Sequence, residues 1–175
     1  AHMLKAYAAG LDLHRKTAAV VAGVATSQVT PEQRQAAKAV NFGLLYGQGA
    51  RGLANYARAQ YGVAMSLTQA EQARRAFFKA YPGLQRWQQQ TVGQARRSGC
   101  IATPDGRVRR FKTGRFYSEA LNTPIQGGAA EVLLATLSLL EAHLAGIDAL
   151  LVNLIHDEIV LEVAREDGPR ACRAL

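Results

Sequence analysis

This sequence of 175 residues has few cysteines, no long apolar run and no pattern of a secretory leader. Two cysteines, Cys100 and Cys172, are too few for a disulfide scaffold and are typical of a reducing compartment. No stretch approaches 18 uncharged apolar residues, so we expect no membrane-spanning segment, and no signal-peptide pattern opens the chain. With 49% hydrophobic and 19% charged residues, the composition excludes disorder and predicts one domain, or one and a fraction, in the cytoplasm.

Acidic residues are also scarce in the first two thirds of the chain. Residues 1–118 contain 18 lysines and arginines against four acids, a net charge of +14, whereas residues 119–175 carry a net charge of −6. A basic body followed by an acidic end suggests polyanion binding by the first part and metal binding by the second. An ordinary cationic surface remains the alternative.

Helical patterns dominate the first 100 residues. Apolar spacing predicts a helix over 12–23, and Thr30-Pro31-Glu32-Gln33 is a start signal for a helix that runs to about Tyr46. A capping box at Thr68 and Glu71 predicts a helix to about Ala80, and a further helix runs from about Leu84 to Gly99. Ala1-His2-Met3 resembles the remnant of an expression tag and is set aside from the fold.

Two hairpins and a long helix are expected after residue 99. Pro104-Asp105-Gly106 is turn chemistry between short β-like runs, and the runs 149–155 and 159–163 flank His156-Asp157-Glu158. Thr123-Pro124 signals the start of an apolar helix that ends near Gly146. Basic residues crowd the first hairpin and its flanks: Arg96, Arg97, Arg107, Arg109, Arg110, Lys112 and Arg115. We read Glu131, Glu141 and His143 as helix surface.

Two cations and two aromatics share one face of the helix predicted over 31–46. Arg34, Lys38, Phe42 and Tyr46 follow one another at steps of four residues. Such a stripe could follow a nucleotide from end to end, with the cations on the triphosphate and the aromatics on the sugar and base. The alternative is an ordinary amphipathic helix with its aromatics in the core and its cations in solvent.

Polar residues elsewhere in the chain suggest further contacts. The hairpin tip offers Asp157 and Glu158 to a hard cation such as Mg²⁺, although a solvated polar turn has the same pattern. Strand alternation predicts that His156 and Glu158 point to one side and Asp157 to the other. The amides of Asn122 and Gln126, flanking a helix start, could read minor-groove acceptors or simply cap the helix. His14 could donate to a phosphate or be structural.

Together these pieces resemble family A DNA polymerases of the bacterial DNA polymerase I type. Motif B of that family, Arg-x3-Lys-x3-Phe-Gly-x2-Tyr-Gly, is matched from Arg34 to Gly47, and motif C, His-Asp-Glu, is matched by residues 156–158. Residues 122–127 resemble the family's Asn-x-Pro-x-Gln-Gly segment, and residues 12–15 resemble its Asp-Ile-His-Arg element. All four elements occur in the family's order, from about Leu4 to near the end of the chain.

The resemblance implies an α+β fold, with a mainly helical fingers subdomain over 4–118 followed by a partial palm over 119–175. The incoming dNTP would be bound by His14, Arg34, Lys38, Phe42 and Tyr46, and Lys38 would also donate a proton to the leaving pyrophosphate. Tyr46, Asn122, Gln126 and His156 would contact the primer–template DNA. Asp157 would bind catalytic Mg²⁺ in a two-metal site, supported by Glu158.

The sequence also departs from the family pattern. Motif A, which carries another metal-binding Asp, is not found in the chain, so we expect an incomplete two-metal site and no polymerisation by this chain without the missing palm and thumb portions. Ser118 and Leu154 stand where many relatives have Arg and Gln. A non-catalytic nucleotide- or nucleic-acid-binding module is therefore the alternative. A single-subunit RNA polymerase is disfavoured by Phe42 and Glu158.

Overall fold

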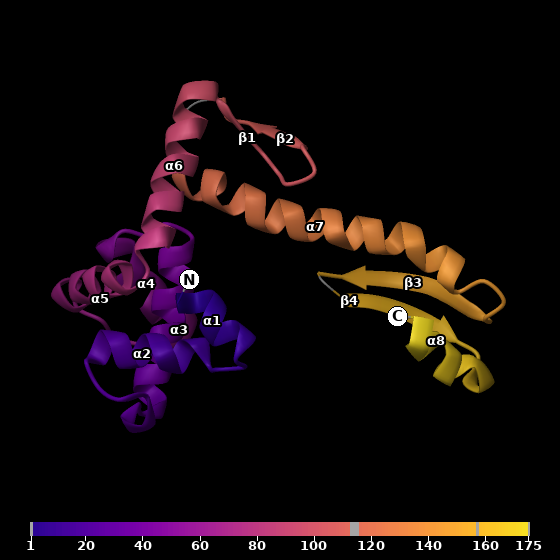
Figure 1. The fold of residues 1–175 in the computed structure, drawn as a ribbon, viewed down its shortest axis with the longest axis horizontal. Coiled ribbons are helices and arrows are strands. Elements are labelled where there is room, and N and C mark those ends of the chain that lie inside the picture. Colours follow the sequence, from indigo (N-terminus) through magenta and orange to yellow (C-terminus); the bar gives the residue numbers. More distant parts are fainter. Residues whose placement is uncertain (1, 113–115, 157, 175) are drawn as a thin grey trace. The chain divides into compact units, whose positions relative to one another are not determined.

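The computed structural model describes residues 2–112, 116–156 and 158–174 (Figure 1). The fold is mainly helical with two two-stranded sheets, β1–β2 and β3–β4, which confirms the predicted α+β class. Contacts divide the chain into two compact units: a first unit of residues 1–101 and 108–122, and a second unit of residues 102–107 and 123–175.

The first helix is α1 (His2–Ala8), and it includes two of the three residues that the sequence analysis set aside. Met3 packs against the main core of the first unit. Asp12 then caps α2 (Leu13–Ala22), and Gly23 ends that helix in the left-handed conformation, as the sequence predicts. A short 3-10 turn, η1 (Thr26–Gln28), leads to the next helix.

The helix α3 (Pro31–Leu45) begins at the predicted signal. Thr30 accepts a hydrogen bond from the Gln33 backbone, and the Gln33 side chain accepts one from the Thr30 backbone, which completes a capping box. Pro31 occupies the first helical position, where a missing N–H costs nothing. Tyr46 ends the helix, so the predicted bounds of this element are confirmed.

Three more helices complete the helical part of the first unit: α4 (Ala50–Tyr61), α5 (Leu67–Ala80) and α6 (Pro82–Ser98). The predicted capping box of α5 is wrong. Ser66 has the extended backbone of a cap and exchanges hydrogen bonds with Gln69, so Thr68 already lies inside the helix. The next helix, α6, begins at Pro82, two residues before the predicted start at Leu84.

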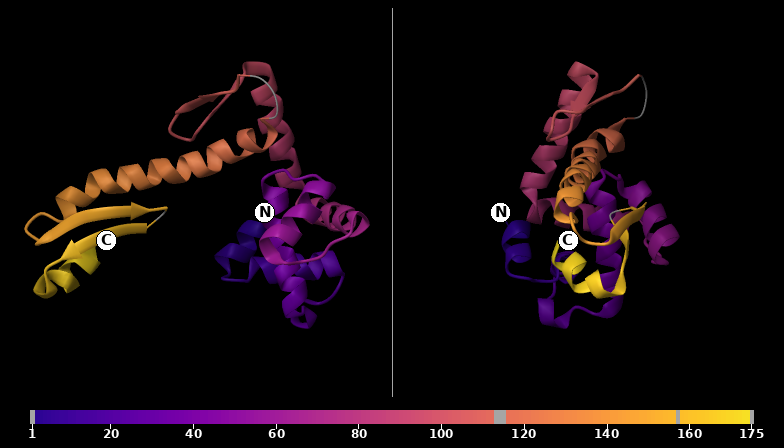
Figure 2. Two further views of the ribbon diagram at one scale, coloured as in Figure 1. Left: turned by 180° about the vertical axis from the view of Figure 1, so that it is seen from behind. Right: turned by 90° about the vertical axis from the view of Figure 1, so that its right-hand side faces the viewer.

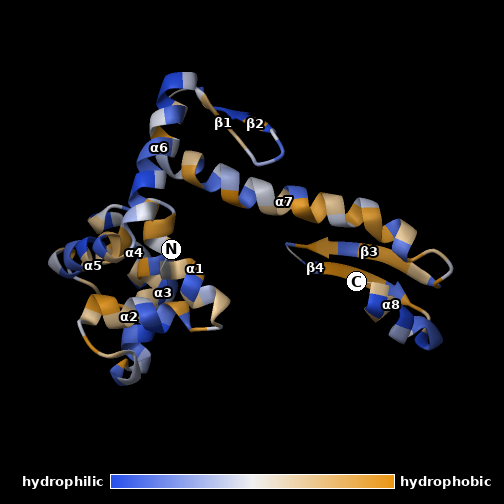
Figure 3. Cartoon of the chain, viewed as in Figure 1, coloured by the Kyte–Doolittle hydropathy of each residue, from blue (hydrophilic) through white to orange (hydrophobic). Residues whose placement is uncertain are grey.

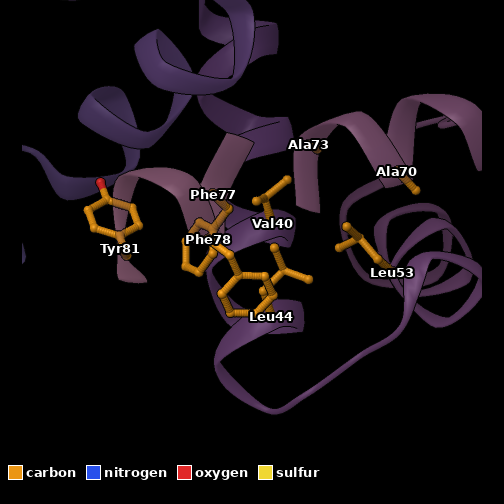
Figure 4. Packing of buried hydrophobic residues seen from close by; sticks show 8 residues of the cluster. All are labelled: Val40, Leu44, Leu53, Ala70, Ala73, Phe77, Phe78 and Tyr81. Carbon is orange, nitrogen blue, oxygen red and sulfur yellow. The ribbon is translucent and has the colours of Figure 1, made fainter. Parts of the chain in front are cut away.

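The main core of the first unit lies between α3, α4 and α5 (Figure 4). Its largest fully buried side chains include Phe77, Leu44 and Leu53. Phe77 meets Phe78 and Tyr81 edge to face, with ring centroids 5.4 and 4.9 Å apart. This core fixes the inner face of α3, and the opposite face of α3 is free to present polar side chains.

The long helix α7 (Tyr117–His143) begins six residues before the start signal at Thr123-Pro124. Pro124 therefore lies inside the helix, and Asn122 and Gln126 are helical residues rather than flanking ones. Burial explains the earlier start, because Ala120 and Leu121 are fully buried and Ala120 packs in a cluster that includes Phe116. Tertiary packing of this first turn outweighs the local signal.

The first hairpin joins β1 (Cys100–Ala102) to β2 (Val108–Arg110) around the predicted turn. Glu131 holds this turn, and the interpretation of Glu131 as helix surface is wrong. Its side chain is 10% exposed, accepts a hydrogen bond from the Thr103 hydroxyl, and lies 3.5 Å from Arg107 Nε. Its other oxygen accepts from the Asp105 backbone at 3.3 Å. Sequence spacing gave no signal for this contact.

The second hairpin pairs β3 (Ala149–Ile155) with β4 (Glu158–Val163) in antiparallel register, with Ile155 opposite Glu158 and an irregularity between Leu151 and Asn153. It confirms the hairpin predicted from residues 149–163. A short turn, η2 (Arg165–Asp167), and α8 (Gly168–Ala174) follow it. Figure 2 shows the same hairpin and α8 from two further directions.

Hydrophobic residues are frequent along α7, β3 and β4 (Figure 3), and many of their side chains in the second unit are exposed. On β3, Leu150 is 64% exposed, and on α7, Val132 is 68% exposed. By length and mean hydropathy alone (27 residues, 1.2), α7 could cross a membrane, and 11% of that apolar stretch is buried. One such helix is weak evidence, because core helices of proteins that never enter a membrane share the property. The expectation of no membrane-spanning segment therefore stays untested.

Candidate functional site

The predicted stripe on α3 lies outside the core. Phe42 is 38% exposed, which does not fit the alternative that buries the aromatics of this helix. Arg34 is half-buried and its Nε donates to Asp12 Oδ2 at 2.6 Å. Asp12 uses its other oxygen to accept from the backbone N–H groups of His14 and Arg15, so the residue that caps α2 also orients Arg34 on α3.

The imidazole of His14 lies beside the same face of α3. Its ring centroid is 5.7 Å from that of Phe42, with the two planes tilted by 44°. Its Nδ1 is 2.9 Å from the amide nitrogen of Asn41, a buried residue of α3. Lys38 is close enough to act on His14 electrostatically. The structure therefore gathers His14, Arg34, Lys38 and Phe42 on one surface of the first unit.

The surroundings lower the pKa values of both Asp12 and His14, which favours the charged carboxylate and the neutral imidazole. Hydrogen bonds from the Arg15 backbone and then the Arg34 side chain lower the pKa of Asp12, which keeps it anionic. Burial lowers the pKa of His14, and the cations Arg34 and Lys38 lower it further, against an opposing effect of Asp12. A carboxylate and a neutral imidazole thus lie beside two half-buried cations at neutral pH.

Gln88 holds the carboxyl end of α3, immediately before Tyr46. Its amide nitrogen donates to the carbonyl oxygen of Leu44 at 2.6 Å and to that of Leu45 at 3.1 Å. Carbonyls at a helix end have no partner within the helix, so this buried side chain satisfies them. Gln88 could not be predicted from the sequence, because a glutamine on a polar helix such as α6 carries no distinctive pattern.

The chain turns sharply after Tyr46. Gly47 has a φ of +78°, and a Cβ at this position would lie 2.3 Å from Cε1 of Tyr117. A cavity of about 260 Å³ lies beside the turn and is lined in part by Gln48, Arg74 and Tyr117. Tyr46 itself is half-buried at this turn, and its neighbour Tyr56 has a raised pKa because of burial and a hydrogen bond with Tyr61.

The two amides predicted to read DNA lie in successive turns of α7. In the first unit, Asn122 is half-buried and its Oδ1 has no hydrogen-bond partner among the described residues. In the second unit, Gln126 is exposed and lines a groove of about 790 Å³. His156 and Ile159 line the other side of this groove, together with small and apolar residues of α7. The second unit therefore brings Gln126 and His156 to one surface.

The tip of the second hairpin differs from the predicted alternation. His156 is a turn residue with a φ of +58°, so the strand pattern does not pass through it. Asp157 lies outside the described residues, and Glu158 is exposed at the start of β4. In the described part of the chain, no three His, Cys, Asp or Glu side chains are grouped to hold a metal ion. Glu158 is a suitable oxygen donor, but these residues alone do not complete a metal centre.

The basic residues of the first hairpin and its flanks are exposed. Arg96 and Arg97 end α6 in solvent, and Arg110 and Lys112 are exposed in and after β2. Two others form ion pairs: Arg107 with Glu131, and Arg109 with Glu119 at 2.8 Å. The predicted Arg115 lies outside the described residues. The exposed cations of the first unit suit contact with a polyanion.

Comparisons with known proteins identify the family to which the chain belongs. The sequence profile of DNA polymerase family A matches residues 1–175. The chain is 44% identical over 166 residues to DNA polymerase I of Aquifex aeolicus, covering 94% of this chain and 29% of that protein. It is 34% identical to DNA polymerase I of Bacillus caldotenax, covering 98% of this chain and 20% of the relative. The chain thus spans about a fifth to a third of the length of these relatives.

A solved structure agrees with the sequence relatives. The POL domain of Pol1 from M. smegmatis, determined in complex with DNA primer-template and dNTP, superimposes with a TM-score of 0.81 at 29% identity. The match covers 97% of this chain and 31% of that one. Family profile, sequence relatives and fold agree, and the chain belongs to DNA polymerase family A.

Proposed function

We propose that the chain supplies the dNTP-binding fingers and part of the palm of a template-directed DNA polymerase. The observation that carries the proposal is the surface of the first unit on which His14, Arg34, Lys38 and Phe42 meet. Arg34 would bind the triphosphate by its guanidinium, with Asp12 setting its direction. Lys38 would bind the triphosphate as a point charge and donate a proton to the leaving pyrophosphate.

The aromatic residues of the stripe complete the proposed nucleotide site. Phe42 would pack against the sugar, and Tyr46, at the end of α3, would lie at the templating position. A half-buried aromatic at a helix end that Gln88 holds in place suits a stacking contact with a base. The M. smegmatis polymerase domain was determined in complex with DNA primer-template and dNTP, which supports the assignment of both ligands.

Primer–template DNA would contact the chain through Asn122, Gln126 and His156. Gln126 and His156 line one groove of the second unit, and their side chains can both bind the hydrogen-bond acceptors that every base pair presents in the minor groove. The exposed arginines of the first hairpin would add phosphate contacts. We place this activity in the bacterial cytoplasm, as DNA replication or repair.

Catalysis would use divalent cations, for which we propose Mg²⁺. Asp157 and Glu158 are the proposed carboxylate ligands, and the cations would lower the charge barrier to attack of a primer 3′-OH on the dNTP. Because the described residues do not complete a metal centre, further carboxylates would come from other palm portions of the polymerase. The exposed apolar side chains of α7 and β3 would pack against those portions.

A second candidate function is a nucleotide- and DNA-binding module that does not itself polymerise. The observation that favours it is that the family's motif A, which carries another metal-binding Asp, is not found in the sequence. In this case the first unit would still bind dNTP, and only the chemical step would be lost. The two candidates therefore differ in one measurable property.

Titration and primer extension test these proposals. Calorimetric titration of the chain with dTTP should show binding that weakens in Arg34→Ala and Lys38→Ala, whereas unchanged affinity in both would overturn the nucleotide site. DNA binding should weaken steeply with salt because phosphate contacts release counterions, and a flat response would contradict the DNA-binding surface. Primer extension by the 175-residue chain with Mg²⁺ separates the candidates: we expect none without added palm portions.

A further inference from the structure

Asn41 is a polar side chain in the buried face of α3, where its neighbours are core residues. It is 4% exposed, and its amide nitrogen lies 2.9 Å from Nδ1 of His14 on α2. An amide NH₂ group is a donor without acceptor capacity. For the two atoms to be hydrogen-bonded, Nδ1 of His14 has to present a lone pair.

A second hydrogen bond engages the oxygen of this amide. The hydroxyl of Thr17, which is fully buried, donates to Oδ1 of Asn41 at 2.9 Å. The same hydroxyl oxygen is 3.3 Å from the phenol oxygen of Tyr81, so a donor is available to it in turn. With Oδ1 occupied by Thr17, the NH₂ group is directed at His14. A buried chain of polar groups thus runs from Tyr81 to the nucleotide surface.

We propose that Asn41 is a positioning residue that fixes the tautomer of His14, so that the neutral imidazole carries its proton on Nε2 and can donate it to a phosphate. The phosphate ligand rests on the proposed function; the tautomer itself does not. An imidazole has one proton when neutral, and a donor at Nδ1 leaves Nε2 as the protonated nitrogen. His14 would then act as an uncharged donor beside the cations Arg34 and Lys38.

Burial of the ring favours this neutral donor, and the charged groups around it act in both directions. Asp12 on the loop before α2 opposes the positive charges of Arg34 and Lys38 on α3, and burial disfavours the imidazolium. Burial and the two cations lower the pKa of His14, so the ring is neutral at pH 7. Without such a partner, a neutral imidazole would populate both tautomers. The hydrogen bond from Asn41 to Nδ1 would favour the tautomer with its proton on Nε2.

Long-range ¹H–¹⁵N correlation spectroscopy of the imidazole groups tests the assignment at pH 7.5, with His14→Gln identifying the His14 signals. We expect the wild-type chain to show a protonated Nε2 and an unprotonated Nδ1. Asn41→Asp presents an acceptor to Nδ1, so it should move the proton to Nδ1 and raise the pKa of His14. Asn55→Asp makes the same change at an exposed position of α4 and should leave the His14 signals unchanged.

Thr17→Val is the second variant, because it keeps the volume of the side chain and removes the hydroxyl that orients the amide. It should give a mixture of both tautomers. A wild-type His14 protonated on Nδ1, or an Asn41→Asp protein with an unchanged Nε2 proton, would overturn the proposal. If both variants fail to fold, the wild-type spectrum alone decides.

Titration with dTTP separates this inference from the proposed function. We expect Asn41→Asp to weaken dTTP binding about tenfold, the effect of losing one phosphate hydrogen bond, and Asn55→Asp to leave it unchanged. A wild-type chain that has the Nε2 proton but does not bind dTTP would overturn the proposed function and leave the tautomer assignment standing. Unchanged dTTP affinity in a folded Asn41→Asp protein with a shifted tautomer would overturn the positioning role.

Discussion

Oδ2 of Asp12 lies 2.6 Å from Nε of Arg34 and joins the loop before α2 to the outer face of α3. The two side chains are 37% and 39% exposed, so water screens their attraction. The contact is therefore worth little for stability, and its effect is to restrict the direction of the guanidinium.

Replacing Arg34 by alanine should separate binding from stability. We expect the free energy of unfolding to change by less than about 1 kcal/mol, because the ion pair is exposed. The affinity for dTTP should fall by about tenfold or more, since a charged hydrogen bond to the triphosphate is lost. Denaturant unfolding and calorimetric titration measure the two quantities. Arg58→Ala removes the same charge from α4 and should leave dTTP binding unchanged; equal losses in the two variants would contradict the assignment.

Replacement of Asp12 should reveal its role as a helix cap. Asp12→Ala removes the acceptor for two backbone N–H groups of α2, at a cost of about 1 kcal/mol in the free energy of unfolding. Asp12→Asn keeps an oxygen in the same place, and asparagine caps helices about as well as aspartate. Urea denaturation of both variants measures the difference. If Asp12→Asn proves as destabilised as Asp12→Ala, the charge rather than the cap is what stabilises α2.

The buried imidazole of His14 predicts a pH dependence of stability. Its pKa is lowered in the folded chain from an ordinary value of 6.5, so the unfolded chain binds more protons below that pH. The free energy of unfolding should therefore decrease as the pH falls through about 6.5 towards the lower pKa of the folded state. Urea unfolding between pH 8 and pH 5 measures this slope. His14→Gln should reduce it, and an identical slope in that variant would show that other groups cause it.

Gly47 cannot be replaced without displacing Tyr117. Gly47→Ala would place a methyl group 2.3 Å from the Tyr117 ring at a φ of +78°, so we expect the free energy of unfolding to fall by more than the 1 kcal/mol or so that the φ alone costs. Gly62→Ala is the matched control: its φ is +64° and nothing lies within 4 Å of the added atom. Thermal unfolding compares the two variants. Equal shifts in Tm would mean that the Tyr117 contact relaxes freely.

Gln88 should matter far more than its exposed neighbours on α6. Gln88→Leu removes the side-chain donor of the Leu44 and Leu45 carbonyl oxygens, which we expect to cost about 1–3 kcal/mol of unfolding free energy, although the Leu44 oxygen keeps the Gly47 backbone N–H at 3.1 Å. Gln90→Leu makes the same change in solvent and should have little effect. Hydrogen exchange at the carboxyl end of α3 adds a local measurement. Unchanged protection there in Gln88→Leu would contradict the proposed role in holding Tyr46.

Local signals predicted the elements of the first unit well where a cap and a helix start coincide. Thr30, Pro31 and Gln33 fix the start of α3 through contacts within four residues, so the sequence alone was enough. At α7 the same kind of signal was wrong. The burial of Ala120 and Leu121 depends on packing with other parts of the chain, and neither spacing nor capping residues report such packing.

In the candidate site, too, relationships within one helix were predictable from the sequence and contacts between distant residues were not. A step of four residues placed Arg34, Lys38 and Phe42 on one helix face, since helix geometry makes that relationship local. The partners of these residues were not predictable. Asp12 is 22 residues from Arg34 and Asn41 is 27 from His14, while Gln88 reaches carbonyls more than 40 residues away. Contacts at such separations follow from the assembled fold.

The strand β3, Ala-Leu-Leu-Val-Asn-Leu-Ile, has consequences for handling the protein in solution. It contains no charged residue, and Leu150, Leu151 and Val152 are all more than two-fifths exposed. Asn153 is the one polar residue in this apolar strand, so we expect concentrated samples to self-associate through β3. A lysine in place of Val152 would place charge repulsion between approaching copies. Ultracentrifugation over a range of concentrations would then show a more monodisperse species than the native sequence gives.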